Sequence, residues 1–145
     1  MKTLNILSLC GLLALASVAS AFDREATLAK HKEECQLKLV LAMGLAAQKD
    51  SGKSQAELEK VAAKSKNPEI MAPMVKELFA QPELQGRTFT FYNFESCLIS
   101  KATNKQPIAI NLVSAPLKAC ESKHSEMESF IKCIDSTIIN YEQKS

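Results

Sequence analysis

The chain has 145 residues, a formal net charge of +2, and 46% hydrophobic and 23% charged positions. These values are typical of one globular domain and exclude disorder throughout and a collagen-like repeat. With 4 Gly and 5 Pro, an all-β fold of many tight turns is disfavoured. The near-neutral charge, carried mostly by Lys, argues against nucleic-acid binding.

The first residues are typical of an export signal. Lys2 precedes an apolar run from Leu4 to Val18, and Ala19-Ser20-Ala21 matches the small-x-small pattern of a cleavage site before Phe22. The run is too short for a confident transmembrane span, and no stop-transfer segment follows it. We therefore expect a signal peptide over residues 1–21, a single domain over residues 22–145, a periplasmic or secreted bacterial protein, and no membrane span in the mature chain.

The first half of the mature chain predicts a helical hairpin. Asp23 can cap a helix with a broad apolar face, and Gly52 suits the turn that ends it. Ser54-Gln55-Ala56-Glu57 is a capping box that opens a second, short helix.

Two further helices are expected around residues 67–81 and 87–101. Asn67-Pro68 is typical of a helix start, while Pro73 either kinks this helix or marks its true beginning. Residues 87–95 are ambiguous, because Thr88 to Phe91 alternates like a strand. The spacing of Phe91, Phe94, Cys97 and Leu98 fits one helical face, and we favour the helix.

Residues 102–113 break the helical pattern. Pro107 is followed by the apolar, β-branched run Ile108 to Val113, for which we expect a short extended segment. Ile108, Ile110 and Leu112 share a period of two, so they are candidates either for a buried strap or for an edge that binds a partner.

Two more helices are expected after this segment. Ser114-Ala115-Pro116 can open a short helix through Cys120, and Ser125 to Glu128 is a second capping box for a helix ending near Tyr141. The predicted fold is an all-α bundle of five or six helices, braced by two disulfides, with one short extended segment.

Four cysteines remain after the signal, and an even count in a short exported chain indicates disulfides. Three pairings are open. We favour Cys35–Cys97, which would link two apolar helix faces, and Cys120–Cys133, which requires a chain reversal near residues 122–125. Zinc is the alternative, but no two cysteines have the usual knuckle spacing.

Few residues could carry chemistry. His31 and Cys35 have a spacing that could bind metal, and His124 lies in the predicted reversal, but we favour an exposed histidine at position 31 and an ordinary polar loop residue at position 124. The chain contains no nucleophile-elbow, zincin, P-loop or dinucleotide motif. We expect no enzyme activity, no metal site and no cofactor.

The aromatic cluster from Phe89 to Phe94 predicts core packing. A hydrophobic ligand pocket and an exposed anchor for a protein partner are its alternatives.

Several segments resemble a pattern in small exported bacterial proteins. These are Cys35, the helix end at Gln48 to Ser54, the run Glu77 to Pro82, and Phe94-x-x-Cys97. The pattern is similar to periplasmic immunity proteins that neutralise type VI secretion amidase effectors, which are small, helical and disulfide-braced. It covers about residues 30–100, whereas residues 104–145 depart from it.

The resemblance implies an exported protein that acts by protein–protein interaction, with an immunity-type inhibitor of a toxic periplasmic enzyme as its specific form. A carrier of a small apolar ligand and a secreted virulence or envelope-stress factor are the alternatives. The resemblance assigns no functional residues.

Overall fold

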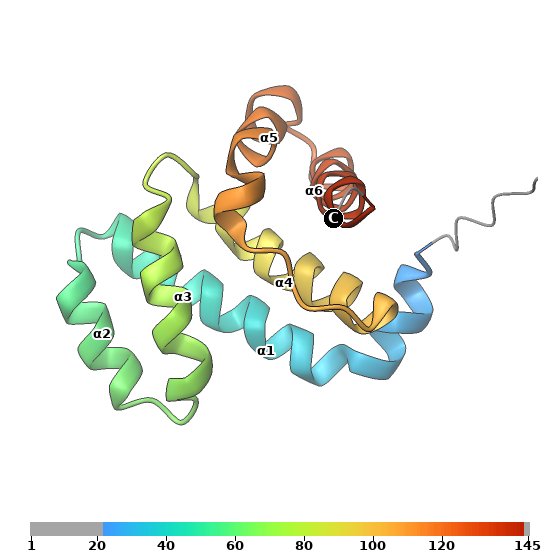
Figure 1. The fold of residues 1–145 in the computed structure, drawn as a ribbon. Helices are drawn as coiled ribbons and strands as arrows, with labels where there is room; N and C mark the ends of the chain where they lie inside the picture. Colours follow the sequence, from blue (N-terminus) through green and yellow to red (C-terminus); the bar gives the residue numbers. More distant parts are fainter. Residues whose placement is uncertain (1–21, 144–145) are drawn as a thin grey trace, which may run out of the picture.

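The computed structural model describes residues 22–143, so the expected signal peptide lies outside the described residues. The described part consists of six helices and no strand: α1 (Arg24–Asp50), α2 (Gln55–Ala63), α3 (Pro68–Ala80), α4 (Gly86–Thr103), α5 (Ile110–Lys123) and α6 (Met127–Glu142) (Figure 1). The all-α prediction is confirmed, and residues 87–95 are helical.

The helices form three packed pairs. α1 lies along α4 in the antiparallel direction, with Cys35 bonded to Cys97 and Ala46 beside Gly86 (Figure 1). The α2–α3 hairpin packs on this pair through α3, and the α5–α6 hairpin packs on α4. The α1–α4 pair is therefore the platform on which both hairpins rest.

Two of the predicted helix boundaries are present in atomic detail. The Asp23 side chain accepts a hydrogen bond from the backbone N–H of Ala26, and Ser54 and Glu57 form the complete capping box. Gly52 has φ of +94°, a conformation that side chains with a Cβ rarely adopt. Asp23 thus fixes the start of α1, and Gly52 and the capping box fix the sharp turn between α1 and α2.

Gly86 opens α4 for a different reason. A Cβ there would lie 3.0 Å from the Cβ of Ala46 and 3.0 Å from Oδ2 of Asp50. The glycine therefore permits α4 to begin in close contact with the end of α1.

Buried side chains from all six helices form one main core, and Cys35, Phe94, Cys97 and Leu98 form a second, smaller cluster. Phe89 and Tyr92 are buried in the main core and Phe94 in the second cluster, which confirms the core interpretation of the aromatic cluster for these three residues, while Phe91 is half-buried. Both predicted disulfides are present, Cys35–Cys97 and Cys120–Cys133, with Cα atoms 5.5 and 5.8 Å apart.

The expected extended segment from Ile108 to Val113 is wrong for its last four residues, which open α5. Ile110, Val113, Leu117 and Cys120 recur at helical spacing and are all buried. Burial of this stripe outweighs the β-branched composition of the run, and the exposed Pro116 is accommodated inside the helix.

α3 begins at Pro68, as Asn67-Pro68 predicts, and continues through the exposed Pro73, which therefore does not mark its beginning. One other boundary differs from expectation. The predicted capping box at Ser125 does not form: Glu126 is the residue before α6, and its side chain makes no cap. The predicted reversal is present, because α5 and α6 are joined by residues 124–126.

Candidate functional site

A cavity of about 340 Å³ lies between α1, α3, α4 and the loop before α5. Its volume is within the range of small-molecule sites. The apolar part of its wall comes from Ile70, Pro73 and Met74 of α3, together with Ile108 of the loop. Its polar part combines both charge signs, with Lys38 on α1, Glu69 and Glu77 on α3, and Tyr92, Asn93 and Ser96 on α4.

Tyr92 positions the loop that closes one side of this cavity. Its hydroxyl donates a hydrogen bond to the backbone carbonyl of Ile108. Burial raises the pKa of Tyr92, so the phenol keeps its proton and remains a donor. The loop is thereby fixed to α4 just before α5 begins.

Asn93 and Ser96, which line the cavity, can each accept a hydrogen bond. The side-chain nitrogen of Asn93 donates to the carbonyl of Phe89 over 2.9 Å, so the amide oxygen is the group left to accept. The Ser96 hydroxyl lies close enough to Tyr92 to lower its pKa slightly, against the larger effect of burial. Since Tyr92 donates to Ile108 instead, Ser96 Oγ is buried without a hydrogen-bond partner in residues 22–143.

Glu77 is the half-buried carboxylate of the cavity wall. Within residues 22–143 this carboxylate makes no hydrogen bond and no ion pair shorter than 4 Å. Burial raises the pKa of Glu77, and the nearby Lys38 ammonium only partly opposes this shift. A positively charged ligand group beside Glu77 would therefore stabilise its ionised carboxylate.

A second polar cluster joins the start of α1 to α4 and α6. The Arg24 guanidinium donates to both oxygens of the fully buried Glu95, at 3.1 and 2.6 Å, and lies over the Phe94 ring. Asp135 is 4.0 Å from Arg24 at its nearer oxygen. Burial, and then repulsion from Glu95, raise the pKa of Asp135 to about 8. One guanidinium thus faces two carboxyl groups, and Asp135 holds a proton at neutral pH.

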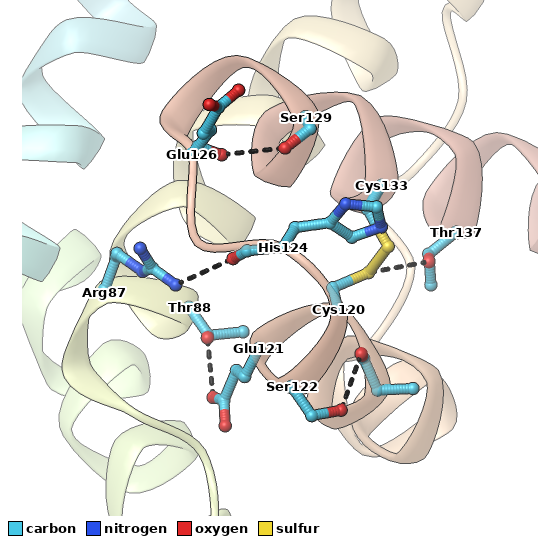
Figure 2. The surroundings of a disulfide bond; sticks show 11 residues. Arg87, Thr88, Cys120, Glu121, Ser122, His124, Glu126, Ser129, Cys133 and Thr137 are labelled. Atoms are coloured by element: carbon cyan, nitrogen blue, oxygen red, sulfur yellow. Dashed lines mark hydrogen bonds between the residues drawn. A yellow bond between two sulfur atoms is a disulfide. The ribbon is translucent and has the colours of Figure 1, made fainter.

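Polar contacts also fix the α5–α6 hairpin to the start of α4 (Figure 2). Glu121 accepts hydrogen bonds from the backbone N–H of Gln85 and the hydroxyl of Thr88. Burial opposes its ionisation, but these bonds and that of Lys118 lower its pKa overall. Arg87 donates to the His124 carbonyl and stacks over the Phe130 ring at 4.0 Å. We interpret this corner as structural support, because Arg87, Thr88 and Glu121 all bond to neighbouring residues of the protein, although Arg87 Nε is buried without a partner among residues 22–143.

An exposed apolar area lies on the outer side of the α1–α4 pair. Val40 and Met43, on adjacent turns of α1, are 51% and 54% exposed. Met43 also lines a shallow groove of about 310 Å³ with Ala47 of α1 and Phe91 of α4, bounded by Asp50 and Arg87. We call Val40, Met43, Ala47 and Phe91 the α1–α4 apolar strip.

The structure separates the three residues predicted as one partner-binding set. Ile110 is buried in α5, Leu112 is 51% exposed, and Ile108 is half-buried at the cavity. They do not share one face, because α5 begins between Ile108 and Leu112. Binding of a partner by any of them stays a prediction.

The other candidates for chemistry are dispersed. Cys35 is in a disulfide, and His31 lies at a kink in α1 with non-helical φ and ψ. The backbone carbonyl of His124 accepts from Arg87 (Figure 2). Across residues 22–143, no group of three or more His, Cys, Asp or Glu side chains could hold a metal ion.

The sequence interpretation missed Glu77, Ser96 and the Arg24–Glu95–Asp135 cluster, and it named Tyr92 only as part of the aromatic cluster. A signal for Glu95 was present, since it lies among Phe91, Phe94 and Leu98 on a face predicted to be buried. An acidic residue there needs a partner. Ser96 and Glu77 carry no comparable signal, because their surroundings come from distant segments.

Comparison with protein-family models, curated proteins and solved structures found no match to this chain. Nothing in these comparisons therefore supports or opposes the resemblance to immunity proteins. Within residues 22–143, none of the helices has the length and apolar character needed to cross a bilayer.

Proposed function

We propose that this chain is an exported protein that acts by binding another protein through the α1–α4 apolar strip. The observation that carries the proposal is the exposure of Val40 and Met43 beside a groove lined by Phe91. Exposed large apolar side chains that gather at one place are typical of interaction surfaces. The groove would accept an apolar side chain of the partner, with Asp50 and Arg87 at its polar rim.

Export is the second part of the proposal, and the two disulfides support it because such bonds persist in oxidising compartments. Protein recovered from the periplasm should begin at Phe22 by intact-mass measurement and contain no free thiol among its four remaining cysteines. A full-length mass, or free thiols, would contradict export by this signal.

The binding experiment compares two exposed apolar residues. Met43→Lys places a charge in the strip, whereas Val61→Lys makes the same type of change at an exposed site on α2. In affinity capture from periplasmic extract with identification by mass spectrometry, one protein should be retained by the parent and by Val61→Lys and lost with Met43→Lys. Equal capture by both variants would contradict a role for the strip.

An immunity-type inhibitor is the specific form of this proposal. Co-expression with a periplasmic amidase effector should restore growth if that effector is the partner, and Met43→Lys should abolish the rescue. The strip could instead bind a second copy of this chain, which sedimentation velocity tests. A dimer that dissociates in Met43→Lys would show that the strip mediates self-association rather than binding of another protein.

The second candidate function is a ligand carrier, which the 340 Å³ cavity favours. The charged and polar groups in its wall argue against a purely apolar ligand, because such a ligand would leave Glu77 and Ser96 buried without partners.

A further inference from the structure

The cavity between α1, α3 and α4 contains one buried hydroxyl that lacks a partner. Ser96 is 4% exposed and its hydroxyl oxygen has no hydrogen-bond partner in the described part of the chain. Asn93 and the half-buried Glu77 line the same space. A buried polar group without a partner is uncommon and costly. The Ser96 hydroxyl, together with these polar neighbours, indicates that the cavity suits a polar molecule.

The charges in the wall indicate what kind of molecule fits. Glu77 and the exposed Glu69, eight residues earlier on α3, attract a cation. Asn93 and Ser96 can accept hydrogen bonds from an ammonium group. Lys38 lines the cavity from α1. It makes no ion pair shorter than 4 Å among residues 22–143, although it lies near enough to influence Glu77. A ligand that carries both charge signs would pair with both Glu77 and Lys38.

The remaining wall is apolar. Ile70, Pro73, Met74 and Ile108 provide aliphatic contacts, and the Tyr92 hydrogen bond fixes Ile108 in place. A short aliphatic side chain would bury its apolar surface there, which favours binding. The cavity volume of about 340 Å³ leaves room for a free amino acid or a dipeptide rather than for a longer lipid.

We propose that this cavity binds a small zwitterion with an aliphatic side chain, namely a free aliphatic amino acid or a dipeptide. The ammonium group lies against Glu77, Asn93 and Ser96. The carboxylate faces Lys38. The inference goes beyond the proposed function and does not depend on it, because the cavity and the α1–α4 apolar strip share no lining residue.

Isothermal titration calorimetry with four probes tests the ligand class. L-Leucine should bind, while isoamylamine, which lacks the carboxylate, and 4-methylpentanoate, which lacks the ammonium group, should each bind about 10-fold more weakly because one charged contact is lost. Glycine should bind most weakly, since it has no side chain to bury. Binding of isoamylamine as tight as that of leucine would overturn recognition of a zwitterion, and no heat with any probe would overturn the site.

Variants assign the contacts. Glu77→Gln should weaken leucine binding about 10-fold with little change in melting temperature, because the carboxylate has no partner to lose. Lys38→Met should weaken leucine but leave isoamylamine unchanged. Glu126→Gln, an exposed change before α6, is the matched control. Unchanged leucine affinity in Glu77→Gln would overturn the proposal, whereas loss of partner capture in Met43→Lys would leave it intact.

Discussion

The α1–α4 pair and the α5–α6 hairpin are each closed by one disulfide, but the two bonds join very different lengths of chain. Cys35 and Cys97 are 62 residues apart, whereas Cys120 and Cys133 are 13 apart. α5 and α6 follow one another directly, while α2 and α3 lie between the helices of the first pair. The first bond therefore fixes the platform of the whole bundle, and the second reinforces a contact that the short turn already favours.

The non-covalent support of the two regions differs in the same way. In the platform, Glu95 is fully buried against Arg24, and Asp135 shares their surroundings. At the hairpin, Glu121 and Arg87 make their bonds near the turn, and Lys118, which pairs with Glu121, is half-exposed. The platform thus depends on the buried cluster of Arg24, Glu95 and Asp135. The hairpin depends on its contacts to the start of α4 (Figure 2).

The largest effect is expected from removal of the long-range bond. Cys35→Ala combined with Cys97→Ala should lower the free energy of unfolding by about 4 kcal/mol, because it releases a loop of about 60 residues in the unfolded chain. Urea denaturation followed by circular dichroism measures this loss. A loss below about 1 kcal/mol would mean that the unfolded chain already keeps the α1 and α4 segments close together without the disulfide.

Removal of the short-range bond should cost less. Cys120→Ala combined with Cys133→Ala deletes the same atoms. At this shorter separation, however, the loop-entropy contribution to the free energy of unfolding is only about 3 kcal/mol. The same urea titration should rank this variant between the parent and the first double variant. The reverse order would show that the α5–α6 hairpin, not the platform, limits stability.

The buried charge cluster should make stability depend on pH. The pKa of Asp135 is about 8 in the folded protein against an ordinary 3.8. Between these values the folded state holds a proton that the unfolded chain has lost, so stability falls as pH rises, by up to about 1.4 kcal/mol per unit.

Asp135→Asn mimics the protonated carboxyl and removes this dependence. Its unfolding free energy relative to the parent should rise by about 2 kcal/mol between pH 6 and pH 8, measured by urea denaturation at each pH. Glu126→Gln, exposed at the start of α6, is the control and should follow the parent. Parallel curves for Asp135→Asn and the parent would contradict a raised pKa at Asp135.

The smallest effect is expected inside the long loop. Ser54→Ala removes the capping box of α2 and should cost about 1 kcal/mol, read from thermal melts. Ser51→Ala should cost less, because that hydroxyl makes a single hydrogen bond, to the Gln48 carbonyl at the end of α1. The cost should be the same with and without Cys35–Cys97, since a local cap and a distant crosslink act independently. A cost that changes with the disulfide would show that α2 is coupled to the platform.

Much of this fold was predictable because its signals are local. Asp23, Gly52 and Ser54-Glu57 each specify a boundary through atoms within a few residues, and all three act as expected. Both disulfides followed from apolar faces and from a necessary reversal.

The errors arose where tertiary packing decides. Ile110 and Val113 are β-branched, yet they enter a helix because it buries them with Leu117. The cavity was not foreseeable for the same reason: Lys38, Glu77 and Ser96 lie on three helices and meet only once the bundle is assembled.

The positions of the two disulfides also determine how the folded chain responds to a protease. A single cut between residues 35 and 97, or between residues 120 and 133, falls inside a covalent ring, so both fragments stay attached until the bond is reduced. A cut between the two rings, in residues 98–119, separates the molecule into two pieces even under oxidising conditions. The exposed residues 104–107, which include Lys105, lie in this interval and outside any helix. After cleavage at Lys105, the α5–α6 hairpin would be an internally crosslinked fragment with no covalent bond to the platform, held only by its packing on α4.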